Sequence, residues 1–222
     1  MADRGARSRR VPLSSDSIVA AAWQLSFAGD HEMVSLRDLG AALGVHPTAI
    51  YRHFRDKREL MTAVADRSLE GVAEAADGIE DPAEAIAAVM LALRAALLAR
   101  PAAARVLAEG PTRRRNEIAL TERVLGLLRT AGLADDLVAE GYHALIELTV
   151  GSSVIDQRVD ALDERERAHT YAGWRADYLR LDPGRFPHLV SLAPRMYGGA
   201  AGDFDFALGL LLDSLRRLAS RR

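Results

Sequence analysis

The chain has 222 residues, of which 49% are hydrophobic and 27% charged, and its formal net charge is −2. This composition is typical of a globular protein and excludes a disordered chain. The absence of cysteine excludes disulfides, thiol catalysis and cysteine-based zinc sites. The longest apolar run, 85–93, ends at Arg94 and is too short to span a bilayer, so we expect a cytoplasmic protein with no membrane partner.

Charge is distributed unevenly along the chain. Residues 1–60 carry eight Arg and one Lys against seven acidic residues, a balance of +2, whereas residues 61–222 carry 20 basic and 24 acidic residues, a balance of −4. A basic amino-terminal part suits nucleic-acid binding, although a solvated basic tail has the same composition. We expect a basic disordered tail over 1–12. Its arginines are Arg4, Arg7, Arg9 and Arg10.

Helical periodicity dominates the sequence, and no alternating strand pattern is found, so the expected fold class is all-α. The first predicted helix starts after Ser14, a good N-cap residue, and ends at Gly29. The second starts after Ser35 and ends at Gly44. A short third helix follows, with His46 as its N-cap, and reaches about residue 54.

The later helices are predicted from capping residues and proline positions. A fourth helix begins after Asp56 and runs long, to about residue 76. Residues 182–203, which are rich in Pro and Gly, are expected to be irregular. The other predicted helices begin at Pro82 and Pro101 or cover 112–131, 137–158, 163–181 and 204–219.

The most informative stretch is 39–57, in which a turn of four residues, 43–46, joins two short helices. Gly44 permits a tight turn, and this arrangement predicts a helix-turn-helix whose second helix enters the major groove of DNA. If Ile50 and Phe54 face the core, the opposite face is free to reach bases and phosphates. That face offers Pro47, Thr48, Tyr51 and Arg52, followed by His53 and Lys57.

This stretch resembles the DNA-binding domain of the TetR family of transcriptional repressors over about residues 13–65. The matching pieces are Leu43-Gly44-Val45, Ile50-Tyr51-Arg52-His53-Phe54 and Asp56-Lys57-Arg58-Glu59-Leu60. The resemblance implies that Tyr51 and Lys57 contact the operator backbone and that Arg37 reads a guanine. Tetracycline repressors carry glutamine where this chain has Pro47, so their operator sequence does not transfer to it.

The predicted DNA-contacting residues are Ser35, Arg37, Pro47, Thr48, Tyr51, Arg52, His53 and Lys57. Some of these residues have an alternative interpretation that the pattern leaves open. Tyr51 could be a core aromatic, which is the interpretation we favour for Phe54. Arg37 and Arg52 could be solvated surface arginines.

The remainder of the chain resembles the tetracycline-repressor branch more loosely, through Leu148-Thr149-Val150-Gly151 and the last helix. The resemblance implies a homodimer that pairs these two helices into a four-helix bundle and binds a small, mainly apolar effector. Val106 stands where tetracycline repressors have a metal-binding histidine, so metal-chelated tetracycline is not the expected ligand. The predicted dimer contacts are Ala144, Leu148, Gly151, Ser152, Leu208, Leu211, Leu212 and Leu215.

Candidate ligand-pocket residues are apolar or aromatic side chains with a few polar partners, the usual composition of a small-molecule site. Such residues can equally belong to an ordinary core. The candidates are Met90, Leu93, Leu97, Val106, Val124, His143, Glu147, Trp174, Tyr178 and Phe186.

No catalytic signature, phosphate-binding loop or dinucleotide fingerprint occurs. Glu140 and His143 have the spacing of half a di-iron motif, but no second copy exists, so a surface or pocket polar pair is the favoured interpretation. We expect neither an enzyme nor a cofactor or metal.

The predicted organisation is a tail over 1–12, a helix-turn-helix domain over 13–60 and a helical ligand-binding and dimerisation domain over 61–222. The predicted function is a homodimeric repressor that leaves a palindromic DNA operator when its effector binds. A ligand-independent DNA-binding regulator is the alternative, and a helical metal-binding enzyme is a more distant one.

Overall fold

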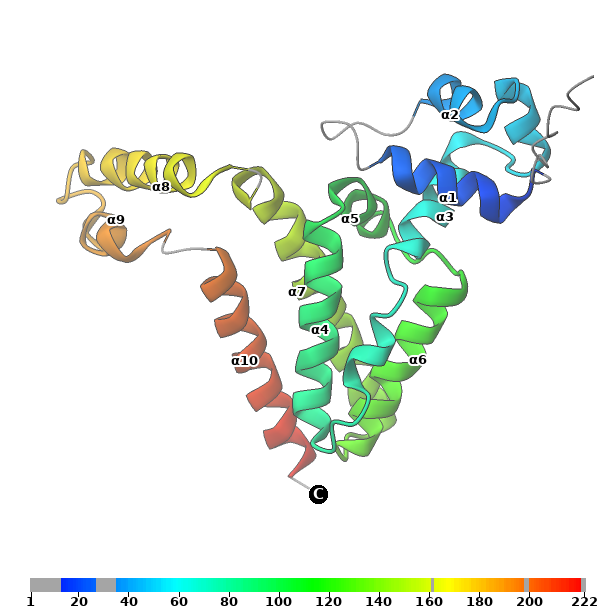
Figure 1. The fold of residues 1–222 in the computed structure, drawn as a ribbon. Helices are drawn as coiled ribbons and strands as arrows, with labels where there is room; N and C mark the ends of the chain where they lie inside the picture. The colour runs from blue at the N-terminus through cyan, green and yellow to red at the C-terminus, as the bar shows by residue number, and fades with distance from the viewer. Residues whose placement is uncertain (1–12, 27–34, 161, 198–199, 221–222) are drawn as a thin grey trace, which may run out of the picture. The chain divides into compact units, whose positions relative to one another are not determined.

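The computed structural model describes residues 13–26, 35–160, 162–197 and 200–220. Throughout these residues the regular structure is helical, without a strand, so the all-α prediction is confirmed (Figure 1). The chain divides into two compact units, 1–64 and 65–222. Each unit is described by itself.

The first unit contains α1 (Ser15–Leu25), α2 (Leu36–Leu43), η1 (Pro47–Arg52) and the beginning of α3 (Lys57–Arg67). The starts of α1 and α2 are confirmed, because the hydroxyls of Ser14 and Ser35 accept backbone N–H bonds there. α1 ends at Leu25, and its predicted end at Gly29 lies outside the described residues. The core of this unit consists of Ile18, Ala22, Leu39, Ile50, Phe54, Leu60, Ala63 and Val64.

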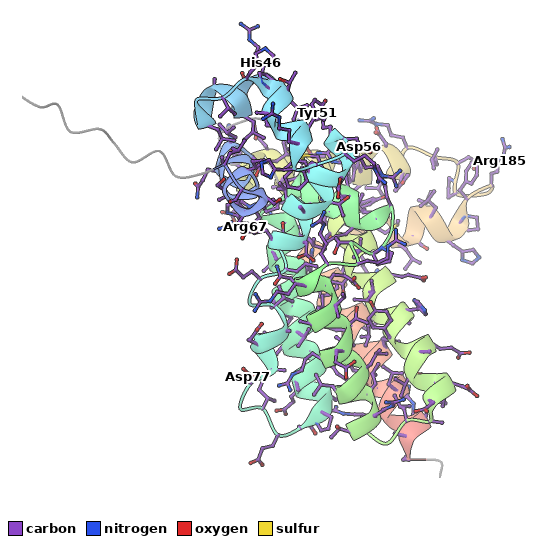
Figure 2. The ribbon with its side chains drawn as sticks, turned by 90° about the vertical axis from the view of Figure 1, so that its right-hand side faces the viewer. His46, Tyr51, Asp56, Arg67, Asp77 and Arg185 are labelled. Carbon is purple, nitrogen blue, oxygen red and sulfur yellow. The ribbon has the colours of Figure 1, made fainter. Side chains whose placement is uncertain are left out.

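The turn between α2 and η1 depends on two glycines. Gly44 has φ of 65°, a conformation that favours glycine. A Cβ on Gly40 would lie 2.9 Å from the carbonyl oxygen of Val45 and 3.2 Å from the ring of Pro47, so the backbones can approach only without one. η1 begins after His46, as predicted (Figure 2). It is a 3-10 helix that ends at Arg52, not an α-helix that reaches residue 54.

α3 ends at Arg67, so the prediction of one helix to residue 76 is wrong. Tight bonds replace the α-helical pattern directly after it: Ser68 N–H donates to Ala65 at 3.0 Å, and Leu69 N–H donates to Asp66 at 3.0 Å. Gly71 then has φ of 80°, which an α-helix does not accommodate. A short 3-10 helix, η2 (Ala73–Ala76), completes the segment.

The second unit is built around α4. Figure 1 shows α4 (green) between α6, α7 and α10, and it also packs against η2 and α5. Pro82 and Pro101 each occupy a first helical turn, which confirms the starts predicted for α4 and α5. The elements are α4 (Pro82–Leu98), α5 (Pro101–Ala108), α6 (Arg115–Thr130), α7 (Asp135–Asp160), α8 (Glu164–Leu179), α9 (Pro187–Leu192), η3 (Ala193–Arg195) and α10 (Ala200–Ala219).

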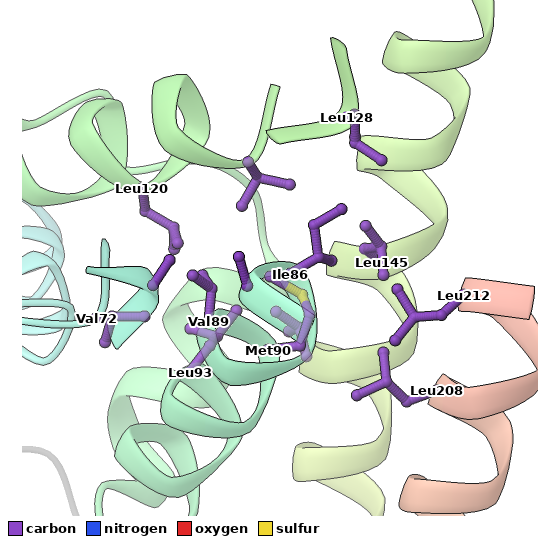
Figure 3. Close-up of a cluster of buried hydrophobic side chains, with 14 of the residues drawn as sticks. Val72, Ile86, Val89, Met90, Leu93, Leu120, Leu128, Leu145, Leu208 and Leu212 are labelled. Atoms are coloured by element: carbon purple, nitrogen blue, oxygen red, sulfur yellow. The ribbon is translucent and has the colours of Figure 1, made fainter. Parts of the chain in front are cut away.

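The core of the second unit surrounds α4, whose Met90 is fully buried (Figure 3). Leu145 of α7 lies beside it, and Leu208 and Leu212 extend from α10 toward the same place. Full burial of a leucine contributes about 1.5–3 kcal/mol, so these contacts hold the helices together. Within the described residues, no single helix is long and apolar enough to cross a membrane; α4 and α5 meet that criterion only together, across a bend of 115°.

α8 carries no buried residue and packs against α9 and η3. The expectation of an irregular 182–203 is therefore wrong in part, because Pro187 begins the short helix α9. Aromatic rings fill the space between these elements. Tyr197 stacks on Tyr171 with ring centres 5.9 Å apart, and its hydroxyl lies 2.9 Å from that of Tyr178.

Candidate nucleic-acid interface and ligand cavity

η1 presents one side to the core and the other to solvent. Ile50 and Phe54 are buried, as predicted. Tyr51, labelled in Figure 2, is 49% exposed and so is not a core aromatic. Thr48 and Arg52 are also exposed. The other predicted residues lie nearby: Pro47, His53 and Lys57 are half-buried, and Ser35 and Arg37 are exposed.

Local hydrogen bonds hold this surface in shape. The Ser35 hydroxyl accepts the backbone N–H of Arg37 at 3.2 Å and so fixes the start of α2. The Nδ1 atom of His46 accepts the backbone N–H of Thr48 at 3.3 Å and lies 2.8 Å from the Thr48 hydroxyl. The side chains of Arg37 and Thr48 therefore extend from helix starts where a cap accepts the residue's own backbone N–H.

The start of α3 combines acidic caps with a lysine. Asp56 accepts the backbone N–H of Glu59 at 2.7 Å, and this bond lowers the pKa of the Asp56 carboxyl. The Glu59 carboxylate in turn accepts the backbone N–H of Arg55 at 2.7 Å. Lys57 occupies the first turn of the same helix, where the helix dipole disfavours a cation. Its position is thus not explained by stability.

A cavity of about 200 Å³ lies within the second unit. Its walls come from α4, α6 and α7, from the end of α5 and the loop after it, and from the segment that follows α3. Most of the lining is aliphatic, as in typical small-molecule sites. The lining residues are Leu69, Leu93, Leu107, Gly110, Pro111, Glu117, Leu120, Thr121, Tyr142, His143, Ile146 and Val150.

Three polar side chains, Glu117, Thr121 and Tyr142, form a hydrogen-bonded row that we call the polar edge of the cavity. The Thr121 Oγ1 donates to Glu117 Oε1 at 2.7 Å and lies 2.8 Å from Tyr142 Oη. The other oxygen, Glu117 Oε2, accepts the backbone N–H of Arg113 at 3.0 Å. Burial raises the pKa of the Tyr142 phenol, so it is protonated at neutral pH.

The amino-terminal end of α6 is held by a carboxylate from α3. Asp66 is 6% exposed, and its Oδ1 accepts the Thr112 hydroxyl at 2.8 Å and the Glu117 backbone N–H at 3.0 Å. Its Oδ2 accepts the Asn116 backbone N–H at 3.3 Å. The N-cap residue Arg114 makes no side-chain cap bond, so Asp66 replaces a local cap.

Only two of the ten predicted pocket residues, Leu93 and His143, line the cavity. The others are placed differently. Three of the predicted pocket residues belong instead to the core of the second unit: Met90, Leu97 and Val124. Val106 is half-buried in α5 and Glu147 is exposed on α7, both outside the lining. Trp174, Tyr178 and Phe186 belong to α8 and the segment before α9.

Sequence reasoning missed the polar edge and Asp66. Glu117 and Thr121 are four residues apart and flank Leu120, a core position of α6, so polar residues on this face were a usable signal. No sequence signal pointed to Asp66, because its hydrogen-bond partners are about 50 positions away along the chain. Among the described residues, no group of three or more His, Asp or Glu side chains is arranged to hold a metal ion. Glu140 and His143 therefore belong to no such group.

The predicted dimer residues divide into two sets. The first set lies on α10 and packs into the core of its own chain, not toward a partner as predicted: Leu208, Leu212 and Leu215. The exposed apolar residues on this helix are instead Phe206, at 70%, and Leu210, at 54%. On α7, Ile155 is 75% exposed. The partly exposed remainder of the prediction is Ala144, Leu148, Gly151, Ser152 and Leu211.

Two protein-family descriptions match the chain. "Bacterial regulatory proteins, tetR family" matches residues 18–64, and "Tetracyclin repressor-like, C-terminal domain" matches residues 73–218. Among curated proteins, the HTH-type transcriptional repressor DrrR1 of Streptomyces coeruleorubidus is 29% identical over 99% of this chain and 84% of its own length.

Solved structures share the fold over nearly the whole chain. A possible TetR family transcriptional regulator from Streptomyces coelicolor A3(2) is 30% identical with a TM-score of 0.77, covering 92% of this chain and 100% of that one. The TetR family protein ActR from Streptomyces coelicolor, in complex with (S)-DNPA, is 25% identical with a TM-score of 0.79, covering 92% of this chain and 98% of that one.

Proposed function

Because the chain belongs to the TetR family of bacterial transcriptional regulators, we propose that it is a homodimeric repressor that leaves a palindromic operator when an effector binds its second unit. The observation that carries the proposal is the largely apolar cavity of about 200 Å³ with one polar edge. The repressor DrrR1 and the ligand complex of ActR support it. The effector is a small, mainly apolar molecule.

We assign operator contact to the exposed side of η1 and the helix starts beside it. Tyr51 and Arg52 reach bases or phosphates, Arg37 reads a base from the start of α2, and Lys57 contacts a phosphate. The other contacts assigned here are Ser35, Pro47, Thr48 and His53.

A second copy of the chain supplies the other half of the interface with DNA. Two recognition helices must meet half-sites about 34–36 Å apart, which one copy does not provide. The exposed apolar side chains Phe206 and Leu210 are one helical turn apart on α10, and Ile155 is exposed on α7. We assign these two helices to the dimer interface, since a second copy would cover their apolar surface.

Release of DNA requires only that the effector bind two states of the dimer unequally. A molecule that prefers the state whose recognition helices do not match the operator shifts the population toward that state. A twentyfold difference in operator affinity corresponds to about 1.8 kcal/mol of coupling. Contacts within one small cavity can supply a difference of this size.

The proposal is tested by titrating the full chain onto labelled DNA from immediately upstream of its own gene, with scrambled DNA as the control. Fluorescence anisotropy should show tight, salt-dependent binding by two protomers to that DNA only. A screen of small apolar molecules should then find compounds that release it. Equal binding to both DNAs would contradict the proposal that the upstream DNA contains an operator. If no compound releases the DNA, a ligand-independent regulator is favoured.

The Lys57→Ala variant should weaken binding to every DNA sequence alike. Removing one phosphate contact should lower the slope of log affinity against log salt concentration by about 1. The free energy of unfolding should not fall, because the replaced cation lies in the first turn of α3. Anisotropy titrations at several salt concentrations measure the slope.

Arg180→Ala is the matched control, since it removes one exposed cation at the end of α8, in the second unit. It should leave the salt slope unchanged. A Lys57→Ala loss confined to one operator sequence would argue for base reading in place of phosphate contact.

A further inference from the structure

We propose that the cavity selects an apolar ligand that carries a hydrogen-bond donor, a hydroxyl or an amino group, and discriminates against the same molecule with that donor blocked. This inference rests on the proposed function, in that the cavity is the effector site. It follows from counting the hydrogens along the polar edge, Glu117, Thr121 and Tyr142.

The hydrogen bonds of the polar edge run in one direction. The single hydroxyl hydrogen of Thr121 is donated to Glu117 Oε1 at 2.7 Å. Thr121 then has only lone pairs for Tyr142, so the contact of 2.8 Å between their oxygens uses the phenol hydrogen of Tyr142. The Tyr142 oxygen is left as an acceptor.

The rest of the lining adds no backbone donor at the loop after α5. Pro111 has no N–H, and the N–H of Gly110 already donates to the carbonyl of Leu107 at 3.1 Å. His143, the remaining polar side chain of the lining, carries an imidazole N–H, but it is exposed to water and does not belong to the hydrogen-bonded row. The polar edge itself, Glu117, Thr121 and Tyr142, thus offers acceptors to a ligand and no donor.

A ligand hydroxyl or amino group satisfies this edge, whereas an ether oxygen in the same place sets acceptor against acceptor. The mismatch leaves polar atoms that the bound ligand covers without partners, which is why sites built for one hydrogen-bonding group reject analogues that lack it. The aliphatic walls, including Leu93, Leu120 and Ile146, suit the hydrocarbon part of such a ligand.

The test measures binding of 2-naphthol and of 2-methoxynaphthalene to the full chain without DNA, by isothermal titration calorimetry. The two probes share their rings and differ in the donor. We expect 2-naphthol to bind at least about tenfold more tightly, although the methyl ether is the more apolar molecule. Equal affinity, tighter binding of the ether, or no binding of either probe up to its solubility limit would overturn the inference.

Two variants test the direction of the bonds. Tyr142→Phe removes the acceptor and keeps the ring, so the preference for 2-naphthol should fall to about twofold or less. Thr121→Val removes the group that holds the Tyr142 hydrogen, which can then turn to the ligand, so binding of 2-methoxynaphthalene should strengthen severalfold. Tyr142→Phe with the full preference retained, or Thr121→Val with unchanged ether binding, would overturn the inference.

Thr130→Val is the matched control for Thr121→Val. It removes another hydroxyl of α6, one that donates to the carbonyl of Gly126 at 2.9 Å and lies outside the cavity lining. It should leave both affinities unchanged. Circular dichroism of each variant verifies that the helices are intact.

This experiment separates the inference from the function on which it rests. Loss of the naphthol preference in a protein that still binds its operator and is released by other compounds overturns the inference alone. A naphthol preference that follows Tyr142 and Thr121 in a protein without operator binding supports the inference and overturns the proposed repressor.

Discussion

The Asp66→Ala variant is expected to lose about 3 kcal/mol of unfolding free energy. The removed carboxylate is buried and accepts the Thr112 hydroxyl and the backbone N–H groups of Asn116 and Glu117. Loss of a helix cap costs about 1 kcal/mol, and a buried donor left without a partner costs about 1–3 kcal/mol more. Urea unfolding followed by circular dichroism measures the difference.

Asp163→Ala provides the comparison, because Asp163 caps α8 through the backbone N–H of Glu166 at 2.8 Å but is exposed. Water can replace its bond, so its loss should be about 1 kcal/mol. An Asp66→Ala loss no larger than this would show that the buried cap is dispensable.

The same bonds connect the cavity to α3. The side chain of Glu117 belongs to the polar edge, and its backbone N–H donates to Asp66. Asp66 lies in the last turn of α3, the helix that begins at Lys57 in the first unit. A ligand that moves Glu117 therefore changes a bond to the far end of this helix. We therefore expect Asp66→Ala to have two effects. It should lower the free energy of unfolding, and it should reduce the change in operator affinity that an effector causes.

Local signals were sufficient for most of the helices. Ser14, Ser35, Asp81 and Asp163 cap the helices that their sequence patterns predict. The end of α3 was missed, because periodicity continued past Arg67 and did not reveal the positive φ of Gly71. Capping chemistry is local, whereas a change of backbone direction inside an apolar pattern depends on tertiary packing.

The cavity and the outer surfaces could not be assigned from periodicity. Leu93 and Leu97 are one turn apart on the same apolar face of α4, yet only Leu93 lines the cavity. α10 has two apolar faces, and the one with more leucines, which includes Leu208 and Leu212, packs inward. Which apolar position meets a neighbouring helix, a cavity or solvent is decided by the packing of the whole unit.

Asp156→Ala is expected to destabilise the second unit by about 3 kcal/mol, the lower end of the usual cost of removing one partner from a buried ion pair, because Asp156 itself is partly exposed. The Arg94 guanidinium of α4 is bonded to the Asp156 carboxylate of α7 at 2.9 Å and lies 4.8 Å from the ring centre of Phe204 on α10. The side chain of Arg94 is only 6% exposed. Without this carboxylate, a buried positive charge loses a negative partner bonded to it at 2.9 Å.

Two comparisons distinguish the contribution of the buried charge to stability from the contribution of side-chain packing. Asp177→Ala breaks the ion pair with Arg180, whose side chains are 68% and 75% exposed, and should cost about 0.5 kcal/mol or less because water screens both charges. The double variant Arg94→Met, Asp156→Leu removes both charges of the pair and should be more stable than Asp156→Ala alone. Urea unfolding measures the free energy of unfolding of all three variants. A double variant less stable than the single one would show that the ion pair stabilises the three helices more than apolar packing in its place.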